Sequence, residues 1–359
     1  MIAKRLRILV LMHSELVPPT KEQESEKEES SKDPYIHLKK LADKDRLETP
    51  WTTEHDILFH LQEMGHKVRA LGVYSDLLKI RAAIDEFKPH IVYNLLEEFD
   101  GETVFDSHVV SYLELLRVPY TGNNPRALMI ARDKSLAKKI LMYHRIKTPK
   151  FAVFPKNKKR KVSKSLQFPL IVKCLDEDAS LALSKASVVH SEEKLYERVD
   201  YINQKIGVDA IVEEFIEGRE FYVGVLGNYR LELLPVWEVF YKKADHPEKE
   251  FYSRSAKWNE KYRSRKGIDS GKAKISPELE KKIQTIAKKT YKALDLNGYA
   301  RIDVRMDKNE NVYVIEANPN PNIAMDDEFA ESSYYQDQWD YHDLLHKILN
   351  LGLGWQKGS

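Results

Sequence analysis

Apolar residues at strand and helix spacing alternate in blocks over the first hundred positions. Residues 7–12 form an apolar run of strand length, and residues 52–65 place apolar side chains at helical intervals. Residues 67–73, 75–87 and 90–97 continue with the patterns of a strand, a helix and a strand. This alternation predicts a parallel sheet covered by helices, with functional groups at the carboxyl ends of its strands.

The rest of the chain has shorter apolar runs separated by turn residues. Turn signals at 119–125 and 147–150 flank a predicted helix that carries "RDKSLAKKIL". Ser276 and Pro277 have the residue types that begin a helix, and residues 299–318 alternate in two runs around a polar turn, which predicts a hairpin. Further strands are predicted at 151–155, at 168–173 and on both sides of Glu217–Gly218.

Charge and composition narrow the class of protein. The 359 residues predict two or three domains, and 42% hydrophobic with 32% charged residues fits a globular chain. Lysine and arginine total 58 against 56 aspartate and glutamate, so we do not expect a nucleic-acid binder. The basic loop at 156–165 is interpreted as a solvated hairpin tip, with an anionic partner as the alternative.

Cysteine content and apolar run length bear on location. Cys174 is the single cysteine, which excludes an intramolecular disulfide and a cysteine-clustered metal site. The first apolar run is too short for a signal peptide, and no apolar stretch approaches the roughly 20 residues that span a bilayer. We therefore expect a cytoplasmic protein without membrane contact. Residues 18–50 are strongly charged and are interpreted as an insertion, with a short helix at 35–41.

The predicted hairpin places chemically active side chains together. Because side chains alternate along a strand, Arg301 and Asp303 share one face, as do Glu316 and Asn318 on the second strand. A turn near 308–310 then brings Asp303 opposite Glu316, and oxygen ligands of this kind suit Mg²⁺. The alternative is that Asp303 pairs with a neighbouring arginine while Asn318 begins a turn.

The chain resembles the ATP-grasp superfamily, and within it the D-alanine–D-alanine ligases, from about residue 90 onward. The motifs that carry the resemblance are "YLELLRVPYTGNNPRALMIARDKSLAKKIL" (112–141), "FPLIVK" (168–173), "IVEEFIEGREFYV" (211–223), "GYARIDVRMD" (298–307) and "VYVIEANPNPN" (312–322). The resemblance implies an α/β (α+β) ATP-grasp fold of three domains, with ATP held between the last two. We expect these at 1–123, 124–211 and 212–359.

The resemblance also implies roles for individual residues. Lys134 and Lys173 match the lysines that reach the nucleotide phosphates, and Lys257 resembles another. Glu220 matches the carboxylate that holds the ribose hydroxyls. The adenine site is implied by Glu213 with the backbone of Glu214 and Ile216, and by the apolar pair Phe215 and Ile315.

The implied chemistry is amide formation driven by ATP. Asp303, Glu316 and Asn318 match the family's metal ligands for Mg²⁺, with Mn²⁺ as an alternative. Arg301 matches the arginine that stabilises the acyl phosphate and the tetrahedral intermediate. The implied reaction is attack of a carboxylate on the γ-phosphate, followed by attack of an amine.

Three departures from the family pattern concern the phosphate loop and both substrate pockets. Residues 174–186 contain no glycine, and Ser180 is the residue there that we expect to keep a phosphate-facing amide. Asp327 stands near the place of a serine that holds the second substrate's carboxylate. The glutamate that binds the first amino group has no secure match, and residues 94–102 offer Glu97, Glu98 and Glu102 instead.

We therefore predict an ATP-dependent carboxylate–amine ligase with rebuilt substrate pockets, acting on small molecules such as an amino acid or peptide. The acids in 94–102 and 325–328 suggest an amine partner with net positive charge, unless they are solvated loop residues. A D-alanine–D-alanine ligase proper is the first alternative. A nucleotide-binding regulator without ligation, or a kinase, is the other. The resemblance is also compatible with a homodimer.

Overall fold

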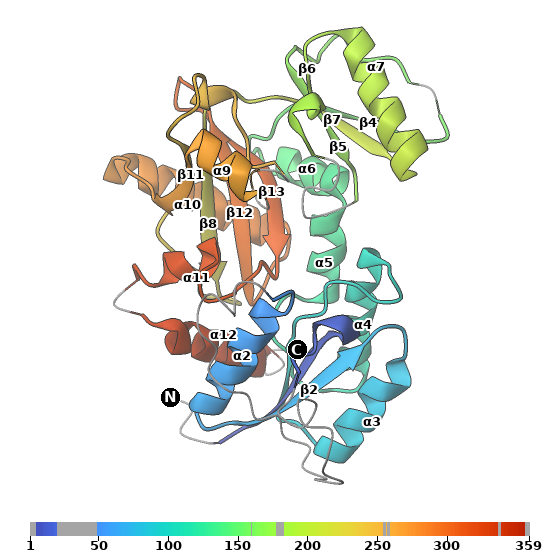
Figure 1. The fold of residues 1–359 in the computed structure, drawn as a ribbon, viewed down its shortest axis with the longest axis vertical. Helices are drawn as coiled ribbons and strands as arrows, with labels where there is room; N and C mark the ends of the chain where they lie inside the picture. The colour runs from blue at the N-terminus through green and yellow to red at the C-terminus, as the bar shows by residue number, and fades with distance from the viewer. Residues whose placement is uncertain are drawn as a thin grey trace.

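A computed structural model describes residues 5–19, 49–158, 160–176, 183–253, 256, 259–336 and 339–355. Three sheets form the body of the molecule, and Figure 1 shows the N-terminal sheet at the bottom and the smallest antiparallel sheet at the top. Most of the predicted insertion, including its expected helix, lies outside the described residues. No helix within the described ranges is long and apolar enough to cross a membrane.

The N-terminal sheet is parallel, as the alternation predicts, with strand order β2-β1-β3. The alternate side chains of β1 enter two different cores, one beside α2 and α12 and the other beside α3 and α4. This explains why the whole run is apolar, because a strand buried on both faces carries no polar alternation. The elements are β1 (Arg7–His13), β2 (Lys67–Val73), β3 (Ile91–Asn94), α2 (Thr52–Glu63), α3 (Leu77–Phe87) and α4 (Asp106–Leu115).

The helix predicted around "RDKSLAKKIL" is two helices, α5 (Pro125–Arg132) and α6 (Lys134–Tyr143). Asp133 separates them because its backbone is extended and its carboxylate accepts the amides of Ser135 and Leu136, each at 2.9 Å. An N-cap of this kind begins a new helix and ends the preceding one. The break was not visible in the apolar spacing, which runs through both helices.

The four-stranded sheet is antiparallel, with strand order β4-β7-β5-β6. It buries one core of its own under a helix that continues as a π-helical turn. The predicted strand at 168–173 is present as β5 and begins after a cis Phe168–Pro169 bond. The elements are β4 (Phe151–Phe154), β5 (Leu170–Cys174), β6 (Val188–Val189), β7 (Ala210–Glu214), α7 (Glu192–Asp200) and η4 (Tyr201–Ile206).

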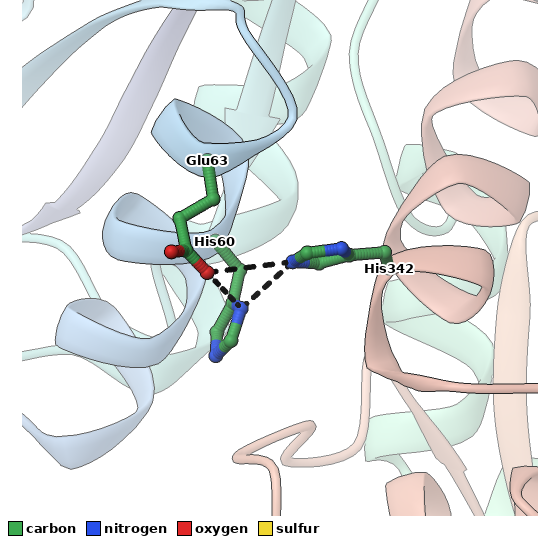
Figure 2. A group of neighbouring side chains, drawn as sticks. All are labelled: His60, Glu63 and His342. Carbon is green, nitrogen blue, oxygen red and sulfur yellow. Dashed lines mark hydrogen bonds and ion pairs between the residues drawn. The ribbon is translucent and has the colours of Figure 1, made fainter. Parts of the chain in front are cut away.

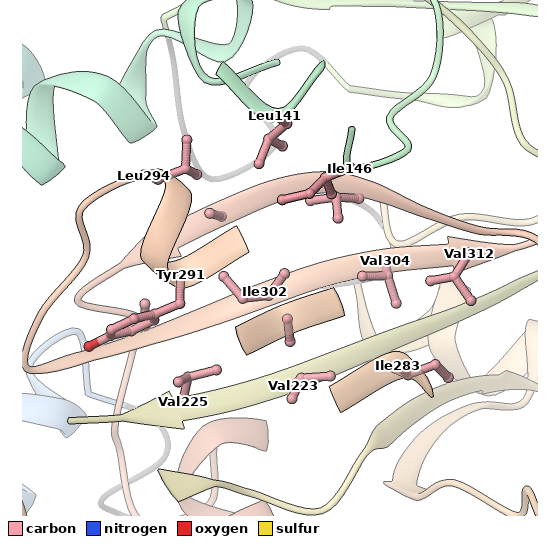
Figure 3. Close-up of a cluster of buried hydrophobic side chains, with 14 of the residues drawn as sticks. Leu141, Ile146, Val223, Val225, Ile283, Tyr291, Leu294, Ile302, Val304 and Val312 are labelled. Atoms are coloured by element: carbon pink, nitrogen blue, oxygen red, sulfur yellow. The ribbon is translucent and has the colours of Figure 1, made fainter. Parts of the chain in front are cut away.

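The largest sheet has the order β11-β10-β8-β12-β13, with β9 beside β8. Figure 3 shows its apolar face, where Val223, Ile302 and Val304 pack against Ile283 and Tyr291 of the long helix α10. The helix begins at Pro277 after the cap Ser276, as predicted, and ends at Ala293. The elements are β8 (Arg219–Leu226), β9 (Glu232–Leu233), β10 (Trp237–Tyr241), β11 (Ile268–Lys272), α10 (Pro277–Ala293), β12 (Tyr299–Met306) and β13 (Val312–Pro319).

The C-terminal helix α12 (Tyr341–Trp355) packs beside α2 on the N-terminal sheet, so the two ends of the chain share one core (Figure 1). The strand β7 (Ala210–Glu214) crosses the expected boundary at 211 and lies in the four-stranded sheet. The three-domain division itself stays a prediction. The remaining short elements are η1 (Ser14–Leu16), η2 (Thr103–Phe105), η3 (Lys185–Ser187), η5 (Pro247–Lys249), α9 (Glu260–Lys266) and α11 (Glu328–Ser333).

Candidate active site

The strands β12 and β13 bring the predicted metal ligands together. Asp303 lies opposite Glu316, and Arg301 lies opposite Asn318, in the antiparallel register. The carboxamide nitrogen of Asn318 donates to Asp303 Oδ2 at 2.9 Å. The expected hairpin is therefore present, and a β-bulge between Asp303 and Val304 sets the register that brings two carboxylates and a carboxamide together on neighbouring strands.

Arg301 holds Asp303 through two hydrogen bonds. Its Nε donates to Oδ1 at 2.8 Å and its Nη2 donates to Oδ2 at 3.1 Å, while its guanidinium lies 4.5 Å from the ring centre of Tyr222. Burial opposes the charged form, but Asp303 outweighs it and holds the pKa of Arg301 well above its ordinary value. The alternative pairing of Asp303 with an arginine thus occurs together with the converging ligands.

Glu213 is a buried carboxylate between two lysines, only 1% exposed at the end of β7. Its Oε1 is 3.2 Å from Lys138 Nζ, and its Oε2 accepts from Lys173 Nζ at 3.3 Å. Burial favours the neutral acid, yet the two lysines outweigh burial and lower the pKa of Glu213. For Lys173, burial is outweighed by Glu213 and Glu316, so its pKa is raised.

Lys138 connects the Glu213 carboxylate to β13, here called the metal-ligand strand because it carries the predicted ligands Glu316 and Asn318. It is 2% exposed, and its Nζ donates to the carbonyl of Ile315 at 2.9 Å and to Thr148 Oγ1 at 3.0 Å. Burial is the largest effect on Lys138 and lowers its pKa, although Glu213 opposes that shift. We did not predict Lys138, but a signal existed, because it lies four residues after Lys134 on the same face of α6.

Glu220 is held by side chains of the largest sheet. Arg305 Nη1 donates to its Oε2 at 3.0 Å, and the hydroxyl of Tyr222 donates to its Oε1 at 3.0 Å. Arg305 also donates to the carbonyl of Glu250 and lies 4.9 Å from the ring centre of Phe215. These contacts fix both a carboxylate and an aromatic ring that the sequence assigned to nucleotide binding.

Residues 215–218 join the four-stranded sheet to the largest one. Phe215 meets Phe251 edge to face, with ring centres 5.9 Å apart. Gly218 has φ +147°, and a Cβ there would lie 1.9 Å from the carbonyl oxygen of Met306. Only glycine fits this position. The predicted turn is therefore a connection between sheets, and Phe251 is an aromatic neighbour that no sequence motif indicated.

One cavity, partly open to solvent, lies between these two sheets. Arg301 is not among the residues that line the cavity, but it donates hydrogen bonds to Asp303, which does line it. Ser180 and Lys257 lie outside the described residues. The cavity is lined by the remaining predicted site residues: Lys134, Lys173, Glu213, Glu214, Phe215, Ile216, Glu220, Asp303, Ile315, Glu316 and Asn318.

The segment after the metal-ligand strand docks onto the N-terminal part of the chain. Asn320, at φ +51°, accepts the amide of Asn123 at 2.8 Å, and Asn322 accepts the hydroxyl of Thr53 at 2.8 Å. Asp56 accepts the amide of Met325 at 2.9 Å. Asn320, between the two prolines, and Asn322, after the second one, therefore attach this segment to the N-terminal part of the chain.

The acids near the expected substrate pockets have protein partners. Asp327 caps α11, and burial followed by Glu328 raises its pKa to about 8, which Arg301 partly opposes. Glu328 Oε2 lies 4.0 Å from Arg301, and Glu98 lies 3.5 Å from His13 at the end of β1. Burial therefore favours the neutral form of the Asp327 carboxyl.

Comparison with known proteins gives consistent results. The family described as D-ala D-ala ligase C-terminus matches residues 135–350. A D-alanine–D-alanine ligase of Carboxydothermus hydrogenoformans is 32% identical over 69% of this chain and 77% of its own length. An uncharacterised protein, y4sG, of Sinorhizobium fredii is 30% identical over 81% of this chain and 84% of its own.

A solved structure shows the same fold. The Bacillus anthracis D-alanine–D-alanine ligase complexed with ATP has a TM-score of 0.71 and 20% identity, covering 98% of this chain and 99% of that one.

Proposed function

The chain belongs to the D-alanine–D-alanine ligase family, and from this premise we propose that it joins a small carboxylate to an amine through an acyl phosphate. The predictions of the ATP-grasp fold and of an ATP-dependent ligase that forms C–N bonds are confirmed by this membership. Members of this family use ATP and a divalent metal ion. The residue roles, the identity of the metal and the substrates are the proposed part.

A single observation carries the proposal, which is that the predicted ATP and metal residues line one cavity. Lys134 and Lys173 supply positive charge for the phosphates at one side, with Lys173 fixed by Glu213. The backbone of 214–216, between the two sheets, faces the adenine. Glu220, fixed by Arg305, accepts the ribose hydroxyls.

The three oxygen-bearing side chains fit a hard divalent ion, and we assign Asp303, Glu316 and Asn318 as its ligands. Two carboxylates in register on adjacent strands repel one another. Arg301 pairs with Asp303 and Lys173 interacts with Glu316, and a divalent ion between the two carboxylates would remove the repulsion that remains. Ligands that are all oxygen favour Mg²⁺, with Mn²⁺ as the close alternative. When bound, the ion neutralises charge on the phosphates during transfer.

The reaction then proceeds in two displacements. A carboxylate oxygen of the first substrate attacks the γ-phosphorus, the bond to the β–γ bridging oxygen breaks, and ADP leaves. The amine nitrogen of the second substrate attacks the acyl carbon, phosphate leaves, and the nitrogen loses a proton. Arg301, buried and permanently charged, stabilises the oxygen that becomes negative at that carbon.

The second candidate function is that of a D-alanine–D-alanine ligase proper, with D-alanine as the substrate. One observation favours it. Asp327 was expected to repel an acceptor carboxylate, but burial raises its pKa and so favours the protonated form. A protonated acid can donate a hydrogen bond to a carboxylate. The leading proposal is nevertheless a different substrate pair, because residues 94–102 and 320–325 carry other groups than the family pattern.

Release of ADP and phosphate against pools of substrate tests the proposal. Amino acids, short peptides, polyamines and carboxylic acids are offered with ATP and Mg²⁺, and Glu316→Gln serves as the inactive control. We expect one carboxylate–amine pair to stimulate release and to yield a product lighter than the two substrates by one water. Turnover by D-alanine alone, with dipeptide formed, establishes the second candidate. A phosphorylated product, or nucleotide binding without stimulated turnover, refutes ligation.

A further inference from the structure

Three side chains from two helices that are distant in the chain converge outside the nucleotide cavity. His60 and Glu63 lie one turn apart on α2, and His342 lies at the start of α12 (Figure 2). His60 Nδ1 is 2.9 Å from His342 Nε2, and Glu63 Oε2 is 3.5 Å from the former and 3.9 Å from the latter. None of the three is among the residues that line the nucleotide cavity.

We propose that these three side chains bind a divalent transition-metal ion, with Zn²⁺ as the best fit. The circle through the three ligand atoms has a radius of about 2.0 Å, which equals the usual distance from zinc to imidazole nitrogen or carboxylate oxygen. One ion near the centre of this triangle therefore reaches all three atoms with the side chains where they are. A small displacement out of the plane leaves a fourth, tetrahedral position for water.

Hydrogen bonding alone accounts for only one side of the triangle. The distance of 2.9 Å between the two imidazole nitrogens is that of a hydrogen bond. The 3.5 Å distance from Glu63 to His60 exceeds the usual N–H···O range but is close to the roughly 3.3 Å that separates two ligands on one tetrahedral ion. The 3.9 Å distance from Glu63 to His342 is longer, so tetrahedral binding requires a small inward shift of these two partly exposed side chains.

The ligand set selects the class of metal. Two imidazoles with one carboxylate suit Zn²⁺ and its neighbours Co²⁺, Ni²⁺ and Cu²⁺, whereas Mg²⁺ and Ca²⁺ prefer oxygen ligands. This set differs from the oxygen-only set of Asp303, Glu316 and Asn318, so the two sites discriminate between metals.

The surroundings hold the ligands in place and leave an entry path. The ring of His60 meets the ring of Tyr341 edge to face at 5.1 Å, and that of Phe59 at 5.2 Å. The side chains of His60, His342 and Glu63 are 17%, 40% and 49% exposed, so an ion can enter from solvent. Both histidines also line a second, open cavity.

The ion would join α2 to α12 close to the segment that follows the metal-ligand strand. Asp56, one turn before His60, accepts the amide of Met325, and the hydroxyl of Tyr341 donates to the carbonyl of Ile323 at 2.8 Å. Metal binding therefore stabilises the docking of residues 323–325 between the two helices. This proposal does not depend on the ligase proposal.

Zinc titration of the full-length chain tests the site. The protein is stripped with a chelator and then held in excess Mg²⁺, which occupies the oxygen-only ligands, and Zn²⁺ is titrated against a chromophoric competitor. We expect one equivalent to bind with a Kd below about 10 µM, and His342→Gln to weaken binding at least about 30-fold. His346→Gln, one turn later on the same helix and outside the triangle, is the matched control and should bind as the parent does.

Co²⁺ gives a second readout that a purely structural role of His342 would not produce. The parent and H346Q should show the intense visible absorption of tetrahedral Co²⁺. H342Q and E63Q, the latter at an exposed position, should lose this absorption while their circular dichroism spectra stay the same as that of the parent. Absence of a tight Zn²⁺ equivalent in the parent overturns the proposal. Equal weakening by H342Q and H346Q also overturns it, as does unchanged binding in both H342Q and E63Q.

Discussion

Replacement of Glu213 by glutamine tests whether the buried lysine–carboxylate cluster is held by charge. The carboxylate is 1% exposed and lies 3.2 Å from Lys138 and 3.3 Å from Lys173. Glu213→Gln leaves Lys138, itself 2% exposed, without its carboxylate partner. The amide keeps the size of the side chain, so the perturbation is mainly electrostatic.

The expected cost follows from these distances and burials. At 3.2 Å and an effective dielectric of about 20, each ion pair contributes about 5 kcal/mol before desolvation is subtracted. Removing one partner of a buried pair costs about 3–5 kcal/mol, because the remaining charge is left without compensation. Lys138→Met should cost less than Glu213→Gln, because Glu213 keeps Lys173.

Urea unfolding of the parent, both single variants and Lys138→Met/Glu213→Gln at pH 7 gives the coupling between the two sites. We expect the double variant to be more stable than the sum of the single losses predicts, by at least about 1 kcal/mol, because it buries no uncompensated Lys138 charge. Strict additivity, or a loss in Glu213→Gln below about 1 kcal/mol, would refute the reasoning that charge holds this cluster.

Three further predictions concern the connection at residues 215–218, the proposed metal ligands and the buried acid Glu54. Gly218→Ala should lower the free energy of unfolding in urea by more than about 2 kcal/mol, because the added Cβ meets a carbonyl oxygen. Gly65→Ala, whose Cβ would have nothing within 4 Å, should lower it less. Equal losses of unfolding free energy in the two variants would contradict the steric argument. Glu316→Gln should abolish Mg²⁺-dependent ADP release, while Glu310→Gln, at an exposed position on the same hairpin, should retain it. Activity of Glu316→Gln near the parent level would exclude Glu316 as a ligand. Burial, with Glu97 and Asp56, raises the pKa of Glu54 from 4.5 to about 7, against a backbone hydrogen bond. The folded state therefore keeps this proton longer than the unfolded state, so stability falls by up to about 3 kcal/mol as pH rises from 4.5 to 7 and above, and Glu54→Gln should remove that part of the slope.

Much of the β12–β13 hairpin, which carries the predicted metal ligands, could be predicted because it depends on the pattern of residues that are close together in the sequence. Alternation along two strands and the position of a polar turn place Asp303 close to Glu316. A β-bulge between Asp303 and Val304, which the alternation does not predict, shifts the register by one residue and sets the two directly opposite. The parallel N-terminal sheet followed from the same kind of pattern. Asp133 shows the limit of this reasoning, because one capping side chain splits a continuous apolar pattern into two helices.

The predicted nucleotide residues come from family motifs, and the contacts that hold them were not predicted. Arg305 and Phe251 each contact a predicted residue without any spacing signal toward it, and the helical spacing of Lys138 from Lys134 gives no indication of its contact with Glu213. A lysine on a helix reads as a solvated side chain until the fold buries it.

The sequence by itself determined the local faces: which residues of each strand and helix point to a core, and which carboxylates share a strand face. These follow from the fixed periods of strand and helix, which are properties of neighbouring residues. Only the tertiary structure decided the partners. It placed β7 and β8 in different sheets, attached α12 to the N-terminal core, and set His60 beside His342 across 282 positions of chain. Such contacts depend on how whole elements pack, and no local period of the sequence records that.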